Sequence, residues 1–271
     1  MQIKPCIFFF VNCKKSSMMD TKEGMSMYEN LKEVIESSNN IVFFGGAGVS
    51  TESNIPDFRS QTGIYSNKTY PYPAEIMISH DFFYDHPKEF YDFYFNEMIY
   101  PDAKPNDAHL ALAKLEQVGK LKAVITQNID GLHQLAGSKK VYELHGSVHR
   151  NYCQKCHAFY SLEDMVKQSN RIPKCTKCNY TIKPDVVLYG ESLNMKTMEE
   201  AIACIEAADV LIVGGTSLVV YPAAGLLRYF HGRKLVLLNK AVTPMDGKAD
   251  IVIHDPIGQV LKEAVLDNPN I

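Results

Sequence analysis

The sequence predicts an α/β fold, in which helices cover both faces of a parallel sheet and a small metal-binding domain is inserted into the chain. Two observations support this prediction. Short runs of branched apolar residues alternate with helical patterns along most of the 271 residues, as in sheets that are buried on both faces. One segment with two Cys-x-x-Cys pairs interrupts that alternation. The length suffices for one large domain and a small insertion.

The first regular elements are a helix and a buried strand. Leu31, Val34 and Ile35 recur at helical spacing and predict a short amphipathic helix. The apolar run 41–44 then predicts a strand. Several methionines lie ahead of this helix, so translation can start downstream of the first one. We therefore expect residues 1–24 to be a disordered N-terminal extension.

The following elements alternate between helices and strands. Residues 60–105 are rich in Tyr, Phe and Pro without a regular period, so we expect loops and short helices there. Asp107 is expected to cap the next helix, whose apolar positions include Leu110 and Leu112 and which ends near Gly119. The later strands are predicted at 122–126, 141–144, 186–188, 210–215, 235–238 and 251–253, and the later helices at about 197–208 and from Pro222.

These elements divide the chain into two predicted domains. Residues 25–150 and 183–271 are expected to form the large domain with the parallel sheet. Residues 151–182 hold the cysteine pairs and are expected to form the zinc-ribbon part of a small domain. The helical part of the small domain is expected within residues 60–105.

Composition restricts the classes of partner. The net charge of −3 and the pI near 6.3 argue against binding nucleic acid through bulk charge. No run approaches the roughly 18 consecutive apolar residues of a membrane span. Seven cysteines is an odd number, and four of them form the two pairs. In a chain of this size that pattern favours metal over disulfides and hence a reducing compartment, so we expect a cytoplasmic protein.

The cysteine spacing predicts a metal site. Cys153 and Cys156 form one pair and Cys175 and Cys178 the other, with the 18 residues 157–174 between them. Two such pairs supply four thiolates to Zn²⁺ in tetrahedral geometry, and four protein ligands leave no position open for a catalytic water. The alternative is a pair of redox dithiols, but those motifs open a helix after a strand and rarely occur as matched pairs. We expect one structural zinc ion.

The run 45–59 follows the first strand and carries closely spaced glycines. Glycines at the end of a strand let the backbone approach a pyrophosphate, and their N–H groups point at it. A plain G-x-G-x-x-G fingerprint is not met, because Thr51 occupies the slot of the third glycine counted from Gly46. One polar turn after a strand is ordinary in α/β proteins, but several together predict a ligand-binding site along the carboxyl edge of the sheet. Three further polar turns follow later strands, at 127–131, 214–217 and 239–240.

His145 stands out among the nine histidines. It lies at the carboxyl end of a strand and is followed by Gly146, which permits close packing against the ring. An isolated histidine is more often a satisfied core or surface group than a catalyst, but its position on the ligand edge favours a general base as the alternative. His109, His133 and His149 are interpreted as core or surface groups.

Taken together, these motifs resemble the sirtuins, the NAD-dependent protein deacylases, and most closely the bacterial type. They occur in the family's order and span about residues 27–265. The resemblance implies a Rossmann-like parallel sheet with helices on both faces and an inserted small zinc-ribbon domain. Besides the cysteine pairs, it rests on GAGVS (46–50), IPDFR (55–59), TQNID (126–130), HG (145–146), PDVVLYGE (184–191) and GTSL (215–218).

The resemblance implies that NAD is a consumed co-substrate, bound between the two domains. It assigns His145 the role of general base on the ribose hydroxyls, while Asn128 helps to orient the ribose and a water. Ile129 and Asp130 would hold the nicotinamide carboxamide, and Phe58 would shield the ribose once nicotinamide leaves. The implied NAD contacts are Ala47, Gly48, Thr51, Phe58, Arg59, Gln127, Ile129, Asp130, His145, Thr216, Ser217, Asn239, Lys240 and Ile257.

The implied partners are acetylated proteins or peptides. The acetyl oxygen would attack C1′ of the ribose, and the products would be free lysine, nicotinamide and O-acetyl-ADP-ribose. The peptide would add as a strand between two chain segments and be read mainly through its backbone. The residues expected to contact it are Val187, Leu188, Tyr189, Gly190, Glu191 and Val219.

Some positions depart from the family. Gly45 and Asn54 stand where threonine and glycine are usual, and asparagine is a residue that tolerates positive φ. Lys183 replaces an arginine, so it keeps the charge but loses the fork of donors. Relatives that remove succinyl or malonyl groups carry a Tyr-x-x-Arg pair where this chain has Phe93 and Asn96. Without the guanidinium an acyl carboxylate has no partner, so we expect acetyl-lysine to be preferred.

Two other functions are alternatives. A mono-ADP-ribosyltransferase would use the same NAD site, although the intact Asn128, Asp130 and His145 favour deacetylation. A zinc-ribbon module that binds nucleic acid or protein would need a basic aromatic surface. Residues 151–182 instead mix basic with acidic side chains, which indicates a solvated face. We expect no membrane partner, no direct nucleic-acid binding and a monomer.

Overall fold

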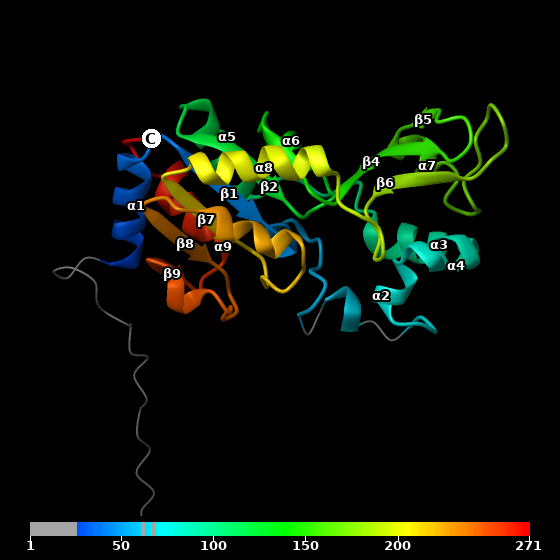
Figure 1. Cartoon of the computed structure of the whole chain (residues 1–271), viewed down its shortest axis with the longest axis horizontal. Coiled ribbons are helices and arrows are strands. Elements are labelled where there is room, and N and C mark those ends of the chain that lie inside the picture. The colour runs from blue at the N-terminus through cyan, green and yellow to red at the C-terminus, as the bar shows by residue number, and fades with distance from the viewer. Residues whose placement is uncertain (1–25, 61–62, 67–68) are drawn as a thin grey trace, which may run out of the picture.

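The computed structural model describes residues 26–60, 63–66 and 69–271. They form two parts, a sheet with helices on both faces and a smaller part built from short helices and short strands (Figure 1). The extension expected over residues 1–24 lies outside the described residues. Within those ranges, no helix combines the length and the apolar character needed to cross a membrane.

Six parallel strands form the main sheet, in the order β3-β2-β1-β7-β8-β9. Phe43 of β1, for example, pairs with Val124 on one side and with Ile212 on the other. The parallel sheet predicted from the sequence is therefore confirmed, and its strand order changes direction beside β1, where such sheets bind ligands. The strands span Ile41–Gly45 (β1), Leu121–Thr126 (β2), Val141–Glu143 (β3), Val210–Gly214 (β7), Lys234–Leu238 (β8) and Ile251–Ile253 (β9).

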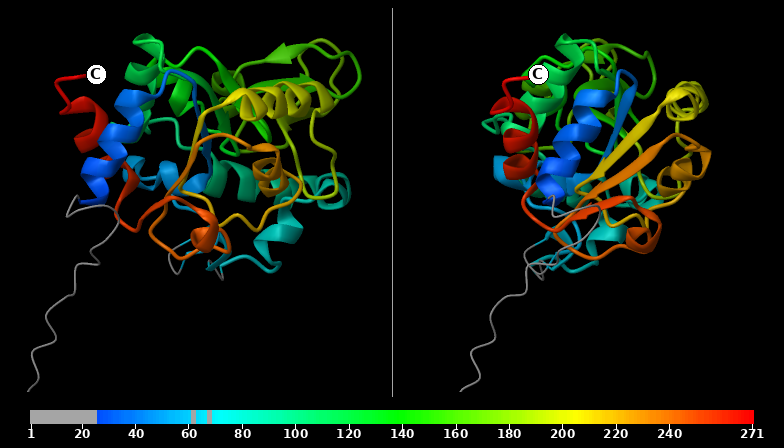
Figure 2. Two further views of the ribbon diagram at one scale, coloured as in Figure 1. Left: turned by 60° about the vertical axis from the view of Figure 1, so that its left-hand side comes forward. Right: turned by 90° about the vertical axis from the view of Figure 1, so that its left-hand side faces the viewer.

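Helices cover both faces of this sheet (Figure 2). Ile41 and Phe43 belong to the core shared with α1, α5 and α9, whereas Val42 and Phe44 belong to the core shared with α8. Successive side chains of a strand point to opposite faces, so a strand covered twice is apolar at every position, and all of β1 is buried. These helices, and a short one between β2 and β3, span Met27–Ser37 (α1), Asp107–Gln117 (α5), Leu132–Ala136 (α6), Met195–Ala207 (α8) and Ile257–Leu261 (α9).

Helix α5 differs from its sequence prediction at two points. Asn106 rather than Asp107 is its N-cap, because Asn106 Oδ1 accepts the N–H of Ala108 at 2.9 Å and Asp107 is already helical. Leu110 was expected on the apolar face of the helix, but its side chain is exposed, because the helix turns Leu112 and its neighbours toward the sheet. Neighbouring Asn and Asp are both good caps, so the sequence alone does not choose between them.

The smaller part joins two stretches of chain around one core. Tyr91 and Phe83 of the helical stretch pack with Met165 and Ile182 of the cysteine-bearing stretch, and the Tyr91 hydroxyl donates to the Ile182 carbonyl. Its strands form an antiparallel sheet in the order β5-β4-β6. The elements span Ala74–Met77 (α2), His80–Asp85 (α3), Pro87–Phe93 (α4), Leu162–Val166 (α7), Gly146–Cys153 (β4), Phe159–Tyr160 (β5) and Ile182–Val186 (β6).

One prediction about the return to the main sheet was wrong. The apolar run 186–188 was expected to be a strand of the main sheet, but Val186 ends β6 and pairs with Gly146 of β4 in the small sheet. A run of three apolar residues does not say which sheet it joins. The helix expected from Pro222 is a 3₁₀ helix over Ala223–Tyr229.

Candidate active site and metal centre

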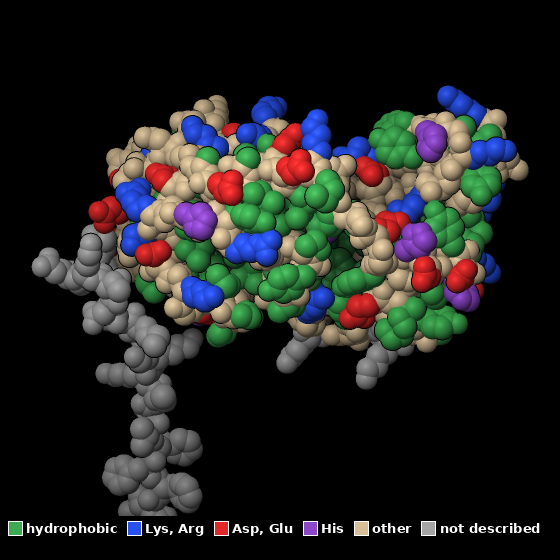
Figure 3. Space-filling model, viewed as in Figure 1, with side chains coloured by type: hydrophobic (Ala, Val, Ile, Leu, Met, Phe, Trp, Pro, Cys, Tyr) green, Lys and Arg blue, Asp and Glu red, His purple; other side chains and the backbone are tan. Residues whose placement is uncertain are grey.

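The turns that follow the main-sheet strands meet at one edge and line a cleft between the two parts (Figure 3). Backbone hydrogen bonds tie these turns together. The N–H of Gln127 donates to the Gly45 carbonyl at 3.0 Å, and the N–H of Gly48 donates to the Gly215 carbonyl at 2.8 Å. The cleft volume is about 1670 Å³. Sites for one small ligand enclose roughly 300–1,000 Å³, so this cleft has room for a dinucleotide and part of a second ligand.

The residues expected at the site line this cleft, with one exception. Val219 is exposed and does not belong to the lining, whereas the adjacent Val220 and Tyr221 do. Leu218 adopts a left-handed backbone with φ 56° and is itself buried, which turns the next side chain outward. The expected residues in the lining are Ala47, Gly48, Thr51, Phe58, Arg59, Gln127, Asn128, Ile129, Asp130, His145, Val187, Leu188, Tyr189, Gly190, Glu191, Thr216, Ser217, Asn239, Lys240 and Ile257.

Both departures in the glycine-rich turn are accommodated by the local structure. Asn54 has φ 61°, the left-handed conformation that asparagine tolerates. At Gly45 an added Cβ would lie 2.6 Å from the ring of Phe43, so that ring already fills the space a side chain would take. The turn therefore keeps its course past the cleft without the usual threonine and glycine.

Ser50 connects the side chains of Asn128, a candidate catalytic residue, and Asp130, a candidate NAD contact. Its hydroxyl donates to Asp130 Oδ2 at 2.7 Å and accepts from Asn128 Nδ2 at 3.0 Å. The other Asp130 oxygen, Oδ1, accepts the N–H of Leu132 at 2.9 Å. A satisfied network of this kind holds both side chains in one orientation. The sequence placed Ser50 in the GAGVS motif but predicted no role for it, because its hydrogen-bond partners Asn128 and Asp130 follow a different strand.

His145 has the hydrogen bonding of a general base. Its Nδ1 lies 2.9 Å from the carbonyl oxygen of Gln127. A carbonyl only accepts, so Nδ1 carries the proton and Nε2 of the neutral ring keeps its lone pair. Burial lowers the pKa of His145 below its usual value, and the bond to Gln127 only partly opposes this. Gly146 has φ 75°. A side chain at this position would clash with the Asp185 carbonyl, because β6 occupies the space that a Cβ atom would need.

The segment after the glycine-rich turn, residues 57–60 and 63–66, folds against the cleft, and we call it the cofactor loop. The carbonyl of Phe58 accepts the N–H of Tyr65 at 2.9 Å, which holds the two ends of the loop together. The Phe58 and Tyr65 rings meet edge to face at 5.5 Å between centroids. Arg59 lies beside them in the cleft lining.

A second segment, residues 187–191, also lines the cleft, and we call it the substrate segment. Glu191 Oε2 accepts the N–H of Leu188 at 2.9 Å and a hydrogen bond from Lys183 Nζ at 3.1 Å. Lys183 Nζ also donates to the Val186 carbonyl at 3.1 Å. The Lys183 ammonium thus donates to two acceptors, the Val186 carbonyl and Glu191 Oε2. A lysine can make both bonds without the paired donors of an arginine.

The structure corrects the argument about the acyl pocket. Phe93 is buried in the core of the smaller part, with its ring edge-on to Tyr70 at 5.0 Å between centroids. Asn96 lines a separate small hollow, and Glu97 and Met98 line the cleft instead. A π-helical turn follows α4 here, and its wider course changes the direction in which side chains point. The preference for acetyl over succinyl groups therefore loses the support of these two positions.

The histidines interpreted as core or surface groups fall into two sets. His149 lies in the cleft lining, with Nε2 2.9 Å from the Asp130 carbonyl, although sequence reasoning gave it no role. His109 and His133 are fully buried under the ligand edge, with ring centroids 4.7 Å apart. Burial lowers the pKa of His109 to about 4 and that of His133 to about 3, so both are neutral in the core.

The four paired cysteines converge on one point, with all Sγ atoms within 4.8 Å of one another. The Sγ atoms of Cys153 and Cys178 are 3.4 Å apart, and those of Cys156 and Cys175 are 3.5 Å apart. Thiolates at about 2.3 Å from a tetrahedral zinc are about 3.8 Å from each other, so the set fits the predicted structural zinc. The Tyr160 hydroxyl donates to Cys175 Sγ at 3.1 Å and orients this ligand.

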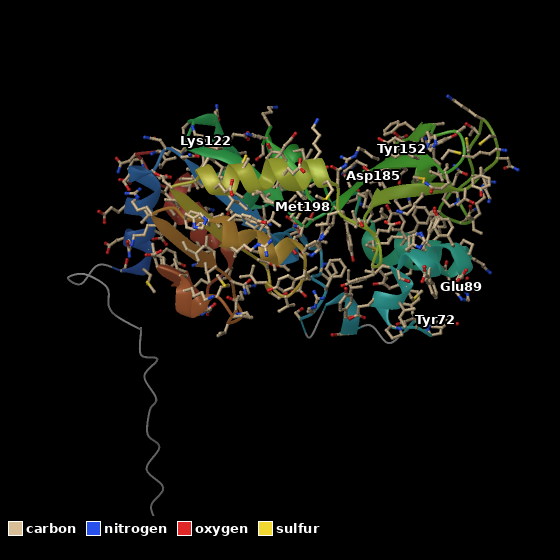
Figure 4. All side chains as sticks on the ribbon, viewed as in Figure 1. Tyr72, Glu89, Lys122, Tyr152, Asp185 and Met198 are labelled. Carbon is tan, nitrogen blue, oxygen red and sulfur yellow. The ribbon has the colours of Figure 1, made fainter. Side chains whose placement is uncertain are left out.

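An ion-pair network joins the two parts at the cleft. Arg150 of β4 donates from Nη1 to Glu143 Oε2 at 2.6 Å and from Nε to Asp185 Oδ2 at 2.8 Å. Glu143 ends β3 of the main sheet, whereas Asp185 belongs to β6. Figure 4 labels Asp185 at the junction of the two parts and Tyr152 farther along the smaller part. The network therefore fixes β4 where it leaves one part for the other.

Comparison with known sequences gives one consistent result. The sequence pattern of the Sir2 family matches residues 46–222. An NAD-dependent protein deacetylase of Clostridium tetani is 62% identical over 238 residues, which cover 88% of this chain and 96% of the relative. Its counterpart in Clostridium acetobutylicum is 59% identical over 236 residues, which cover 87% of this chain and 96% of that protein.

Comparison with solved structures gives the same result. A Sir2 variant with a deacetylated p53 peptide and 3′-O-acetyl-ADP-ribose aligns with a TM-score of 0.83 and 42% identity, covering 91% of this chain and 100% of that one. A Sir2 structure with a p53 peptide and NAD⁺ aligns with a TM-score of 0.78 and 43% identity, covering 90% of this chain and 98% of that one.

Proposed function

The chain belongs to the Sir2 family, and from this premise we propose how its cleft performs the reaction. It is an NAD-dependent protein deacetylase, which removes the acetyl group from a protein lysine and yields nicotinamide and O-acetyl-ADP-ribose. The observation that carries the proposal is the neutral, half-buried His145. Its Nε2 is free to accept a proton in the cleft that Asn128 and Asp130 also line.

NAD binds along the carboxyl edge of the main sheet. The backbone around Gly48 faces the pyrophosphate, where small residues allow close approach. Thr216, Ser217 and Asn239 supply hydroxyl and amide groups for the adenosine end, and all three line the cleft. At the other end Asp130, held by Ser50, receives the nicotinamide carboxamide.

Catalysis rests on His145 and Asn128. The acetyl oxygen forms a bond to C1′ of the ribose as the bond from C1′ to nicotinamide breaks. His145 Nε2 then takes the proton of a ribose hydroxyl, and that oxygen attacks the acetyl carbon. Free lysine leaves as the bond from its nitrogen to the acetyl carbon breaks, and one water adds to that carbon to give O-acetyl-ADP-ribose. Asn128, fixed by its bond to Ser50, orients the ribose and a water, and Phe58 covers the ribose face vacated by nicotinamide. A positioned base of this kind contributes about 10²–10⁴ to the rate.

The acetylated peptide lies against the substrate segment as an added strand. Lys183 Nζ and the N–H of Leu188 both donate to Glu191 Oε2, which holds that segment in place beside the incoming chain. Backbone pairing supplies affinity without demanding one sequence, which suits an enzyme that acts on many proteins. Tyr221 and Val220 replace Val219 as the facing residues on the opposite side.

The zinc ion is structural and holds the ribbon around Cys153, Cys156, Cys175 and Cys178. The large domain holds the parallel sheet and its helices, and the ribbon part of the small domain spans residues 146–186, because β4 and β6 belong to the small sheet. Zinc thiolates require a reducing compartment, which supports a cytoplasmic location. The net charge of −3 supports action on protein without direct nucleic-acid binding, and we expect a monomer by light scattering.

One experiment tests this function. The chain is incubated with an acetyl-lysine peptide and NAD labelled in the adenosine part, and the products are separated. Formation of O-acetyl-ADP-ribose and deacetylated peptide in equal amounts is the expected result. Label transferred to protein without loss of acetyl groups would instead indicate an ADP-ribosyltransferase, and no NAD cleavage at all would indicate a binding module.

A further inference from the structure

Two tyrosine hydroxyls meet where the cofactor loop approaches the substrate segment. Tyr65 Oη lies 2.7 Å from Tyr189 Oη, although the residues are 124 positions apart in the chain. We propose that this phenol bridge holds the cofactor loop against the substrate segment, so that binding of the acetylated peptide strengthens binding of NAD. The inference rests on the proposed function and assigns a positioning role to two residues that make no part of the chemistry.

At the cofactor end, Tyr65 is tied to the residues that cover the NAD site. Its N–H donates to the Phe58 carbonyl, and its ring contacts the Phe58 ring edge to face. The Arg59 guanidinium lies over the Tyr65 ring, 5.3 Å from the centroid. A shift of Tyr65 therefore moves both Phe58 and Arg59 relative to the ribose and phosphates.

At the substrate end, Tyr189 is held by its main chain. Its N–H donates to the Ile78 carbonyl at 3.0 Å, and its carbonyl accepts the N–H of His80 at 2.9 Å. These two backbone bonds pair Tyr189 with Ser79 in an isolated β-bridge. The Tyr189 phenol reaches the cofactor loop, where Arg59 Nη2 donates to Tyr189 Oη at 3.4 Å. The hydroxyl therefore contacts two groups of the loop: it accepts from Arg59, and it shares with Tyr65 a hydrogen bond in which either oxygen can donate.

The Tyr65 hydroxyl remains protonated at neutral pH, so it can donate in an ordinary O–H···O bond. Burial, followed by the bond to Tyr189, raises the pKa of Tyr65 far above its usual value. A hydrogen bond between neutral groups contributes enough to change an equilibrium about two- to tenfold. Since it joins the two binding segments, ordering either one favours the bound arrangement of the other, and the coupling is reciprocal.

The test measures coupling rather than turnover. Carba-NAD, which is not cleaved, is titrated into the whole chain with and without an acetyl-lysine peptide, and the ratio of the two Kd values gives the coupling factor. In Tyr189→Phe and in Tyr65→Phe we expect this factor to fall about two- to tenfold, with unchanged Tm. The double variant should lose no more than either single one.

Tyr180→Phe is the matched control, because Tyr180 is an exposed phenol on the zinc ribbon away from the cleft. It should keep the wild-type coupling factor. The proposal is overturned if both bridge variants also keep that factor, or if they weaken carba-NAD equally with and without peptide. Failure of the wild-type chain to deacetylate the peptide would refute the proposed function instead, and the coupling factor would still be measurable.

Discussion

The main sheet and the cysteine-bearing part are stabilised by different means. The main sheet has apolar cores on both faces, and strands such as β1 and β7 are buried at every position. In the smaller part β5 spans only Phe159–Tyr160 and α7 only Leu162–Val166, and these short elements separate the two cysteine pairs. Such short elements bury little apolar surface among themselves, so the ribbon depends on the metal and on the core that it shares with the helical stretch. The comparison teaches that one chain can rely on solvent exclusion alone in one part and add metal coordination to it in the other.

Removing the metal should break this comparison most strongly. Cys153→Ser or chelation of zinc should unfold the ribbon while the main sheet keeps its structure, because zinc binding supplies on the order of 10 kcal/mol or more in small zinc domains. Hydrogen exchange resolved by peptide would report protection lost over residues 151–182 and kept in β1. Cys204→Ser is the control, since Cys204 lies on α8 outside the cluster and should retain zinc and fold. Zinc-free protein with full activity would contradict the prediction.

His145 lies on the boundary between the two parts, and its replacement should separate chemistry from stability. His145→Ala should lower kcat about 10²- to 10⁴-fold and leave Tm and the affinity for NAD nearly unchanged, because a general base acts in the transition state. The measurements are single-turnover kinetics and calorimetric titration of carba-NAD. The exposed His231 gives the matched control, and His231→Ala should retain the wild-type rate. Near-wild-type turnover in His145→Ala would return His145 to a structural role.

The Arg150 network tests how firmly the two parts are joined. Arg150→Gln should destabilise the chain by about 1–3 kcal/mol in urea unfolding, because Glu143 is left nearly buried without its charged donor. Adding Glu143→Gln should recover part of that loss. Arg233→Gln offers the comparison with an exposed pair, 3.8 Å from Asp209, and should cost less than about 1 kcal/mol. Equal losses in the two arginine variants would mean that the junction is an ordinary surface pair.

The smallest expected effect concerns the pH dependence of the main-sheet core. An unfolded histidine has a pKa near 6.5, whereas burial holds His109 near 4 and His133 near 3, so the unfolded state binds more protons as the pH falls below about 6.5. The stability that the two neutral histidines contribute is therefore fully present above about pH 6.5, and it is lost as the pH falls toward 3–4. His133→Leu should change stability at pH 7 by no more than about 1 kcal/mol, because neither ring nitrogen has a partner, and should flatten the acid loss. Exposed His231→Leu should leave the pH profile unchanged.

Spacing and strand position made much of the site predictable. The cysteine separation fixed the metal cluster, and the place of His145 after a strand put it on the ligand edge, because both are properties of consecutive residues. The alternation of apolar runs predicted the parallel sheet for the same reason.

Errors arose where the answer depended on distant contacts. The run 186–188 joined the small sheet because its partner is β4. Phe93 of α4 is buried in the core, and Asn96, in the π-helical turn that follows α4, lines a separate hollow. The roles of Ser50 and of the Tyr65–Tyr189 contact could not be read at all, since their partners lie 80 and 124 positions away.

The way the inserted ribbon is connected also bears on protein engineering. The chain leaves the main sheet through Gly146 and returns through Val186, and these two residues pair directly. The N–H of Val187 donates to the His145 carbonyl at 3.0 Å, so the two ends of the ribbon are hydrogen-bonded to each other next to His145. The ribbon is thus a cassette with adjoining ends. A ribbon from a relative should be exchangeable by matching the register of that one pair, with the catalytic edge left as it is.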